Sequence, residues 1–145
     1  MDQELNEIKE KIEDFAEKNN IEFVVLFGSR AKGGFSKESD FDIAFLKKGQ
    51  IKLFSNLSEY AGFVSEFVKY LKISSEKMDL VDLSQANILL RKEITESGKL
   101  LYGNRTDYED YRSFAYRDFM DARPLFNLES DLINFKINFL QKLLA

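Results

Sequence analysis

The sequence lacks histidine and cysteine altogether, and it contains a single proline in 145 residues. Without histidine there is no Ser–His–Asp triad, no imidazole proton shuttle and no ordinary zinc site. The lack of cysteine suits a reducing cytoplasm. Any acid–base chemistry must therefore come from carboxylates, lysine or tyrosine.

A basic surplus and long apolar runs are missing too. The 21 Lys and Arg residues against 25 Asp and Glu leave a net charge of −4, which argues against a dedicated nucleic-acid binder. No apolar run approaches the roughly 20 residues of a membrane span, and the acidic residues 1–4 do not resemble a signal peptide. We therefore predict one soluble cytoplasmic domain over residues 1–145, with no membrane partner and no direct nucleic-acid contact.

The most informative stretch begins with a nearly continuous apolar run over residues 21–27, typical of a central strand covered on both faces. Gly28 then permits a backbone conformation that other residues avoid. Residues 29–32 can form a short helix whose free N–H groups face this turn. Helix N-termini bind phosphate through such donors, so the turn is a candidate phosphate site.

A pair of carboxylates follows on the next predicted strand. Asp40 and Asp42 are separated by one residue, so they share a strand face, whereas Phe41, Ile43 and Phe45 point the other way toward a core. Two adjacent carboxylates repel unless a cation lies between them, and Mg²⁺ prefers a few carboxylate oxygens together with substrate phosphates. The pattern indicates metal-assisted phosphoryl chemistry.

A third carboxylate is expected from another strand, over residues 77–83. Asp79 and Asp82 are three residues apart and should face opposite ways, so one of them joins the site. The other would solvate the strand end or help to cap a helix at Ser84.

The rest of the chain predicts helices and one short strand. Apolar periodicity favours helices over residues 2–18 and 53–72, and Ser84 is a good N-cap for a helix ending near residues 97–98. Residues 100–102 suit an edge strand. From residue 106 the chain looks helical, Pro124 should end or kink that helix, and a last helix covers about residues 128–144.

These motifs resemble a known family. The order Gly28–Ser29, ten intervening residues, then Asp40–Phe41–Asp42 resembles the signature of polymerase-β-like nucleotidyltransferases. The run Gly-Ser-Arg-Ala at 28–31 and the third strand Met-Asp-Leu-Val-Asp-Leu at 78–83 resemble the minimal nucleotidyltransferase (MNT) antitoxins that are encoded beside HEPN toxins. The resemblance covers a motif core of residues 21–83 and implies an α/β (α+β) fold: a small mixed sheet backed by helices, with a helical C-terminal segment over residues 106–145.

The resemblance also implies roles for individual residues. Gly28 and Ser29 would hold the β- and γ-phosphates of ATP, and Arg30 is a further candidate for a phosphate contact, with a merely solvated side chain as the alternative.

The metal ligands follow from the same resemblance. Asp40 and Asp42 would bind two Mg²⁺ ions. Asp79, which matches the family's third carboxylate better than Asp82, would bind the catalytic Mg²⁺ and help to deprotonate the attacking hydroxyl.

The function implied is transfer of AMP from ATP to a tyrosine of a partner HEPN ribonuclease toxin, which neutralises the toxin. The size of the chain agrees, because it leaves no room for a second domain that would hold a small acceptor. Two alternatives stay open: an antitoxin that acts by binding alone, and a nucleotidyltransferase that modifies a small molecule such as an antibiotic.

Overall fold

The structure is a computed structural model that describes residues 2–28, 41–52, 54–71 and 78–144. Its elements follow the order α1 (Asp2–Lys18), β1 (Ile21–Phe27), β2 (Phe41–Lys47), a 3-10 turn (Lys48–Gln50), α2 (Leu57–Leu71), β3 (Met78–Asp82), α3 (Ile88–Ser97), β4 (Lys99–Gly103) and α4 (Arg105–Leu144). The predicted helix over 2–18 and strand over 21–27 are confirmed with the same bounds.

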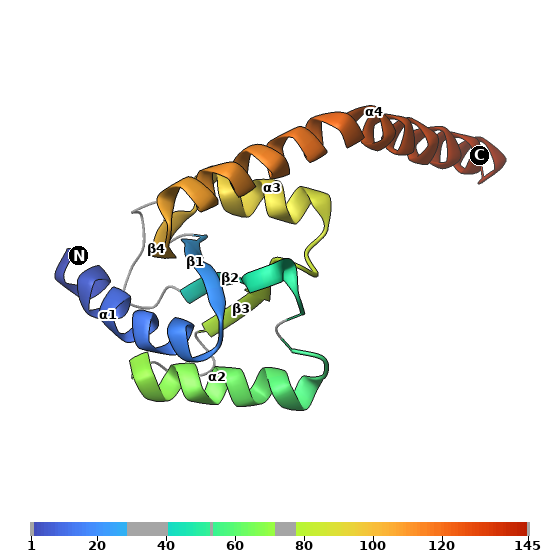
Figure 1. The fold of residues 1–145 in the computed structure, drawn as a ribbon. Coiled ribbons are helices and arrows are strands. Elements are labelled where there is room, and N and C mark those ends of the chain that lie inside the picture. The colour runs from blue at the N-terminus through green and yellow to red at the C-terminus, as the bar shows by residue number, and fades with distance from the viewer. Residues whose placement is uncertain (1, 29–40, 53, 72–77, 145) are drawn as a thin grey trace.

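The strands form one mixed sheet in the order β3-β2-β1-β4. β1 pairs antiparallel with both β2 and β4, whereas β2 and β3 are parallel. A parallel pair needs a crossover connection, and here the connecting chain contains α2 (Figure 1). The apolar strand β1 is therefore central, as its sequence predicts, and the expected short strand is the edge strand β4.

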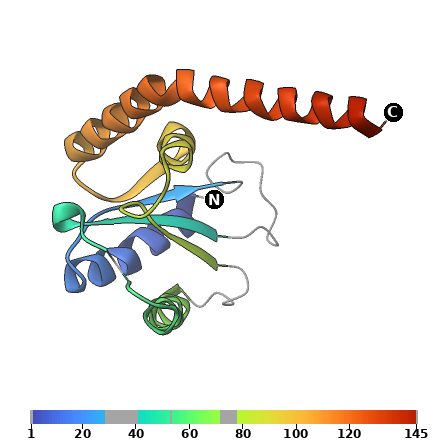
Figure 2. The ribbon, with the colours of Figure 1, turned by 90° about the vertical axis from the view of Figure 1, so that its right-hand side faces the viewer.

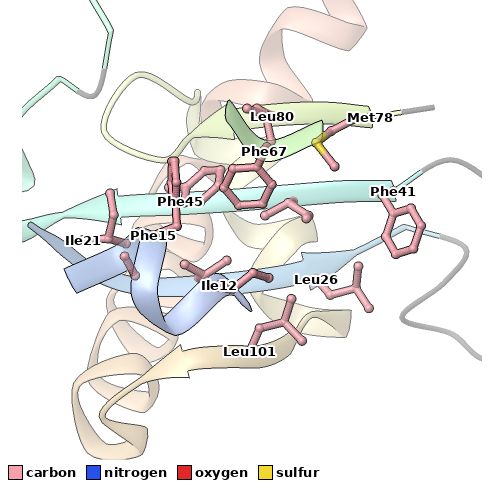
Figure 3. Close-up of a cluster of buried hydrophobic side chains, with 13 residues drawn as sticks. Ile12, Phe15, Ile21, Leu26, Phe41, Phe45, Phe67, Met78, Leu80 and Leu101 are labelled. Carbon is pink, nitrogen blue, oxygen red and sulfur yellow. The ribbon is translucent and has the colours of Figure 1, made fainter. Parts of the chain in front are cut away.

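Helices cover both faces of this sheet, with α1 and α2 on one side and α3 and the first part of α4 on the other (Figure 1). Phe15 of α1, Phe45 of β2 and Phe67 of α2 are the aromatic centre of the first face, shown in Figure 3. The rings of Phe15 and Phe67 lie 4.5 Å apart, and those of Phe45 and Phe67 lie 5.1 Å apart, in edge-to-face geometry. Phe41 and Ile43 join this cluster, which confirms the direction predicted for them.

The second face holds the residues that alternate with these. Phe23 packs edge-to-face on the rings of Tyr108 and Tyr111, with centroids 5.5 and 5.2 Å away. The hydroxyl of Tyr108 donates a hydrogen bond to the carbonyl of Thr95 at 3.2 Å, which ties α4 to α3. Asp42 lies on this face, in line with the buried side chains of Ala44 and Leu46.

Two helix starts differ from the sequence-based prediction because local side chains cap later residues. α2 begins at Leu57 rather than near 53, since the Asn56 side chain accepts a hydrogen bond from the Glu59 N–H at 2.9 Å. The N-cap of α3 is Asn87, whose side chain accepts from Leu90 N–H at 2.8 Å; the prediction that Ser84 has this role is wrong.

The prediction for the C-terminal region is also wrong in one respect. Two helices were expected there, whereas α4 is one continuous helix of 40 residues with Pro124 inside it. Proline removes one main-chain donor and crowds the preceding turn, which a helix relieves by bending. α4 indeed bends partway along its length, where its colour turns from orange to red (Figures 1 and 2). None of the described helices has the length and apolar character that a membrane crossing requires.

Candidate active site

The candidate site lies at the end of the sheet where β1 finishes and β2 and β3 begin. Gly28 follows β1 with φ of +74°, a conformation that favours glycine. Phe27, the last residue of β1, is paired with Asp42 of β2. A Cβ atom on residue 28 would collide with the Oδ2 atom of Asp42, so the glycine allows the backbone turn to lie directly against this carboxylate.

Asp42 and Asp79 are brought together by the parallel pairing of β2 and β3, in which they are direct partners. Neighbouring strands lie about 4.8 Å apart, and side chains at paired positions point to the same face. Asp42 is half-buried and Asp79 is exposed, so the pair lies at the rim of the sheet. Two carboxylates on adjacent strands provide oxygen ligands of the kind that Mg²⁺ uses.

Asp82 has a different environment from Asp79. It is 5% exposed, and its Oδ1 atom accepts hydrogen bonds from the Ser84 N–H at 3.0 Å and the Ser84 hydroxyl at 2.8 Å. These bonds fix the turn that leaves β3. Asp79 is exposed, whereas Asp82 is buried and bonded to Ser84, so Asp79 is the aspartate available to a ligand.

Three of the sequence-predicted site residues, Ser29, Arg30 and Asp40, lie outside the described residues. Within the described part of the chain, no group of three metal-ligating side chains occurs. The structure thus brings together Gly28, Asp42 and Asp79.

A cavity of about 620 Å³ adjoins Gly28 on the face of the sheet covered by α3. Beside Gly28 and Phe27, its wall includes the polar side chains of Lys92, Glu93 and Ser97 from α3. No pattern in the sequence singles out these three residues as part of a site. Their spacing marks them as helical, but nothing in it tells which of them turns toward a strand end some 65 residues earlier in the chain.

A second cavity, of about 540 Å³, shares Lys92 and Glu96 with the first and reaches α4. Lys92 forms an ion pair with Glu96 at 2.6 Å, and its ammonium lies 4.9 Å from the centre of the Phe119 ring. Arg112 and Arg117 of α4 add further positive charge to its wall. Glu109 also lines this cavity and pairs with Arg112 at 3.6 Å, so its wall is polar and of mixed charge.

Tyr111, a buried tyrosine that the charge of Asp82 affects, is unsuited to proton transfer at neutral pH. Burial raises the pKa of Tyr111 to about 12, with Asp82 and Asp118 adding to the increase and Arg91 opposing it. Tyr111 therefore stays protonated, and its role is in the core. The candidate proton acceptors at the sheet edge are the carboxylates.

Comparison with known families gives a match over most of this chain. The model described as "Polymerase beta, Nucleotidyltransferase" matches residues 10–107, which include Gly28, Asp42 and Asp79. The "Protein adenylyltransferase MntA" of Aphanizomenon flos-aquae (strain 2012/KM1/D3) is 30% identical over 125 residues, which cover 84% of this chain and 82% of that protein.

Solved structures with the same fold include two toxin–antitoxin complexes. A chain from a toxin–antitoxin crystal structure with AMP-PNP superposes with a TM-score of 0.69 at 23% identity, covering 86% of this chain and 98% of the solved one. A chain from a complex of tri-AMPylated Shewanella oneidensis HEPN toxin with MNT antitoxin gives a TM-score of 0.66 at 20% identity, covering 89% and 98%. At these identities the likeness establishes the fold.

Proposed function

Since this chain belongs to the polymerase-β nucleotidyltransferase family, we propose that it is a protein adenylyltransferase that transfers AMP from ATP to a tyrosine of a HEPN-family toxin, and so acts as the antitoxin. The observation that carries the proposal is the pairing of Asp42 with Asp79 directly beside the Gly28 turn. The 30% identical relative is named a protein adenylyltransferase, which supports a protein as the acceptor.

The residues at this edge suit Mg²⁺ and a triphosphate. Asp42 and Asp79 would hold Mg²⁺, together with Asp40, because hard oxygen ligands on one face match its preference. Bound Mg²⁺ supplies electrostatic stabilisation to the charge that develops on the phosphate oxygens. Gly28, whose turn lies against the Asp42 carboxylate, is a proposed phosphate contact, and Ser29 and Arg30 are the proposed further ones.

The same carboxylates account for proton transfer in a site without histidine. Asp79 is exposed, so an acceptor hydroxyl can approach it and give up its proton there. The acceptor oxygen then bonds to the α-phosphorus of ATP, and pyrophosphate leaves. Tyrosine suits this step because its hydroxyl has a pKa of about 10, far below that of an aliphatic alcohol.

The open position of the site favours an acceptor that is part of a protein. Asp79 lies at the rim of the sheet, and the polar cavity beside Gly28 leads outward across α3. A tyrosine carried by a docked protein can reach this rim, whereas a small acceptor would need walls to hold it. ATP as the donor and the absence of cysteine both fit the cytoplasmic location that the sequence predicts.

The test uses the purified chain, the purified HEPN protein encoded beside it, Mg²⁺ and labelled ATP, with mass spectrometry of the acceptor. The wild type should add AMP to a tyrosine, and Asp79→Asn should lower the rate by about a hundredfold or more. Asp82→Asn is the matched control, which should stay within a few-fold of the wild-type rate. An unmodified HEPN protein, or full activity in Asp79→Asn, contradicts the proposal.

A further inference from the structure

The second half of α4 is an exposed apolar helix, which we call the C-terminal arm (residues 125–144). Every residue of the arm is exposed, and in Figure 2 the arm extends past the sheet end at which β1 finishes and β2 begins. Eleven large apolar side chains are exposed along it: Leu125, Phe126, Leu128, Leu132, Ile133, Phe135, Ile137, Phe139, Leu140, Leu143 and Leu144.

The amount of apolar surface on the arm is too large for a helix that stays in water. Phe135 is 69% exposed and Leu144 is 88% exposed, against 36% for Phe126, the least exposed of the eleven. Together these side chains present on the order of 1,000 Å² per copy, whereas monomeric proteins rarely show apolar patches above a few hundred Å². A stable interface needs roughly 800 Å² from each partner, which is of the same order as the exposed apolar area of the arm.

The apolar side chains follow a regular helical pattern. The centre line of the apolar face has residues spaced alternately four and three apart, which is the spacing of a helix-pairing seam: Leu125, Glu129, Leu132, Lys136, Phe139 and Leu143. Polar residues lie on the opposite side of the helix: Asn127, Ser130, Asp131, Asn134, Asn138 and Gln141. The seam is therefore apolar except for one acid and one base.

The positions of these two charges decide which occupant fits the seam. Glu129 and Lys136 lie seven residues apart and equally far from the midpoint between residues 132 and 133. In an antiparallel pair of identical helices centred there, Glu129 of each copy lies opposite Lys136 of the other. In a parallel pair, Glu129 would instead lie beside Glu129 of the other copy, and Lys136 beside Lys136. Like charges at a seam are unfavourable.

We propose that two copies of this chain dimerise through an antiparallel pairing of their C-terminal arms, with two reciprocal Glu129–Lys136 ion pairs inside an apolar seam. Such an interface is isologous, as expected for a two-fold dimer. The two arms overlap over residues 125–140 of each copy, so that the folded bodies lie at opposite ends. The dimer needs neither nucleotide nor acceptor, and it is therefore independent of the proposed enzymatic activity.

Charge reversal of the full-length chain tests the pairing, with the molar mass measured by light scattering and the dimer dissociation constant by sedimentation velocity. Glu129→Lys and Lys136→Glu should each weaken the dimer by about tenfold or more, because each places like charges at the seam twice. The double reversal should return the dissociation constant to within about threefold of the wild-type value, because the ion pairs are restored in the opposite sense. An equimolar mixture of the two single variants should form a heterodimer for the same reason.

Two further variants control for effects on folding and on total charge. Asp131→Lys changes the net charge by the same amount as Glu129→Lys but lies on the polar side of the helix, so the dimer should persist. The double variant Leu132→Asn with Phe139→Asn should be monomeric and keep the thermal midpoint of the monomeric body, since the arm is exposed along its whole length. A wild-type chain that is monomeric at micromolar to hundred-micromolar concentration overturns the proposal, including the case in which the arm binds the HEPN protein instead. A dimer that is insensitive to all these changes also overturns it.

Discussion

Replacing Gly28 with alanine tests the contact between the glycine turn and the site carboxylate. The substitution has two consequences that differ in kind. The first is backbone strain, because φ at residue 28 is +74°. The second is a collision between the new Cβ atom and Oδ2 of Asp42. The collision involves the end of a side chain, so Asp42 can rotate away at little cost to the fold, but its carboxylate then leaves the position opposite Asp79.

The expected magnitudes follow from these two terms. A non-glycine residue in the left-handed region costs roughly 1–2 kcal/mol. For a domain of this size the free energy of unfolding should fall by that amount, and the thermal midpoint by about 3–8 °C. The rate of AMP transfer should fall much further, by about a hundredfold, because a catalytic carboxylate displaced by 1 Å or more loses its alignment.

Gly49→Ala is the matched control for backbone strain. Gly49 also has a positive φ, of +79°, but a Cβ there meets only Ile51, whose Cδ1 atom would lie 3.5 Å away. Both variants should lose similar stability in urea titrations, whereas only Gly28→Ala should lose transfer activity. If Gly28→Ala keeps the wild-type rate, or if Gly49→Ala loses activity equally, the contact between residue 28 and Asp42 has no part in catalysis.

Four further changes probe the cap, the turn, the core and the phosphate site. Asn87→Ala should destabilise the fold by about 1 kcal/mol in urea unfolding, because it removes the N-cap of α3; Asn87→Asp, which keeps an acceptor, should recover most of this. Asp82→Asn should cost about 1–2 kcal/mol by weakening the bonds to the Ser84 N–H and hydroxyl, and unchanged stability would show that these bonds contribute nothing. Because burial raises the pKa of Tyr111 to about 12, the unfolded state releases this proton first between pH 10 and 12, so the free energy of unfolding should fall with pH there by up to about 1.4 kcal/mol per unit. Tyr111→Phe should remove that part of the slope, and an identical slope in both proteins would refute the assignment. Ser29→Ala should lower kcat/KM for ATP by about 10- to 100-fold if its hydroxyl bonds a phosphate, as steady-state kinetics can measure; an unchanged value would leave Ser29 as a turn residue.

Local patterns were sufficient to predict much of the sheet and the face on which Asp42 lies. β1 is apolar at almost every position, and the alternation of Phe41, Ile43 and Phe45 with Asp42 assigns each side chain to a face without further information. The opposite directions expected for Asp79 and Asp82 rest on the same two-residue period, and the structure shows Asp79 exposed and Asp82 buried. These predictions depend on neighbours along one strand.

Features that depend on competing local bonds or on distant segments were missed. Ser84 has the residue type of an N-cap, but its hydroxyl and N–H are bonded to Asp82, which leaves the cap to Asn87. Pro124 lies inside α4 without ending it. The contribution of Lys92 to the cavity wall beside Gly28 depends on how α3 packs against the far end of β1, which no local pattern encodes.

Because α4 is one continuous helix, a small tilt partway along it produces a large displacement at its far end. Its first part is fastened to the body by Tyr108, Tyr111 and Ala115, which are buried, whereas the exposed part beyond residue 122 spans roughly 33 Å at 1.5 Å per residue. A tilt of about 10° at the bend near Pro124 would move the far tip by roughly 6 Å, while α3 and the sheet edge that α3 covers stay in place. Whatever binds the tip can therefore reorient the arm relative to the folded body without moving α3 or the sheet.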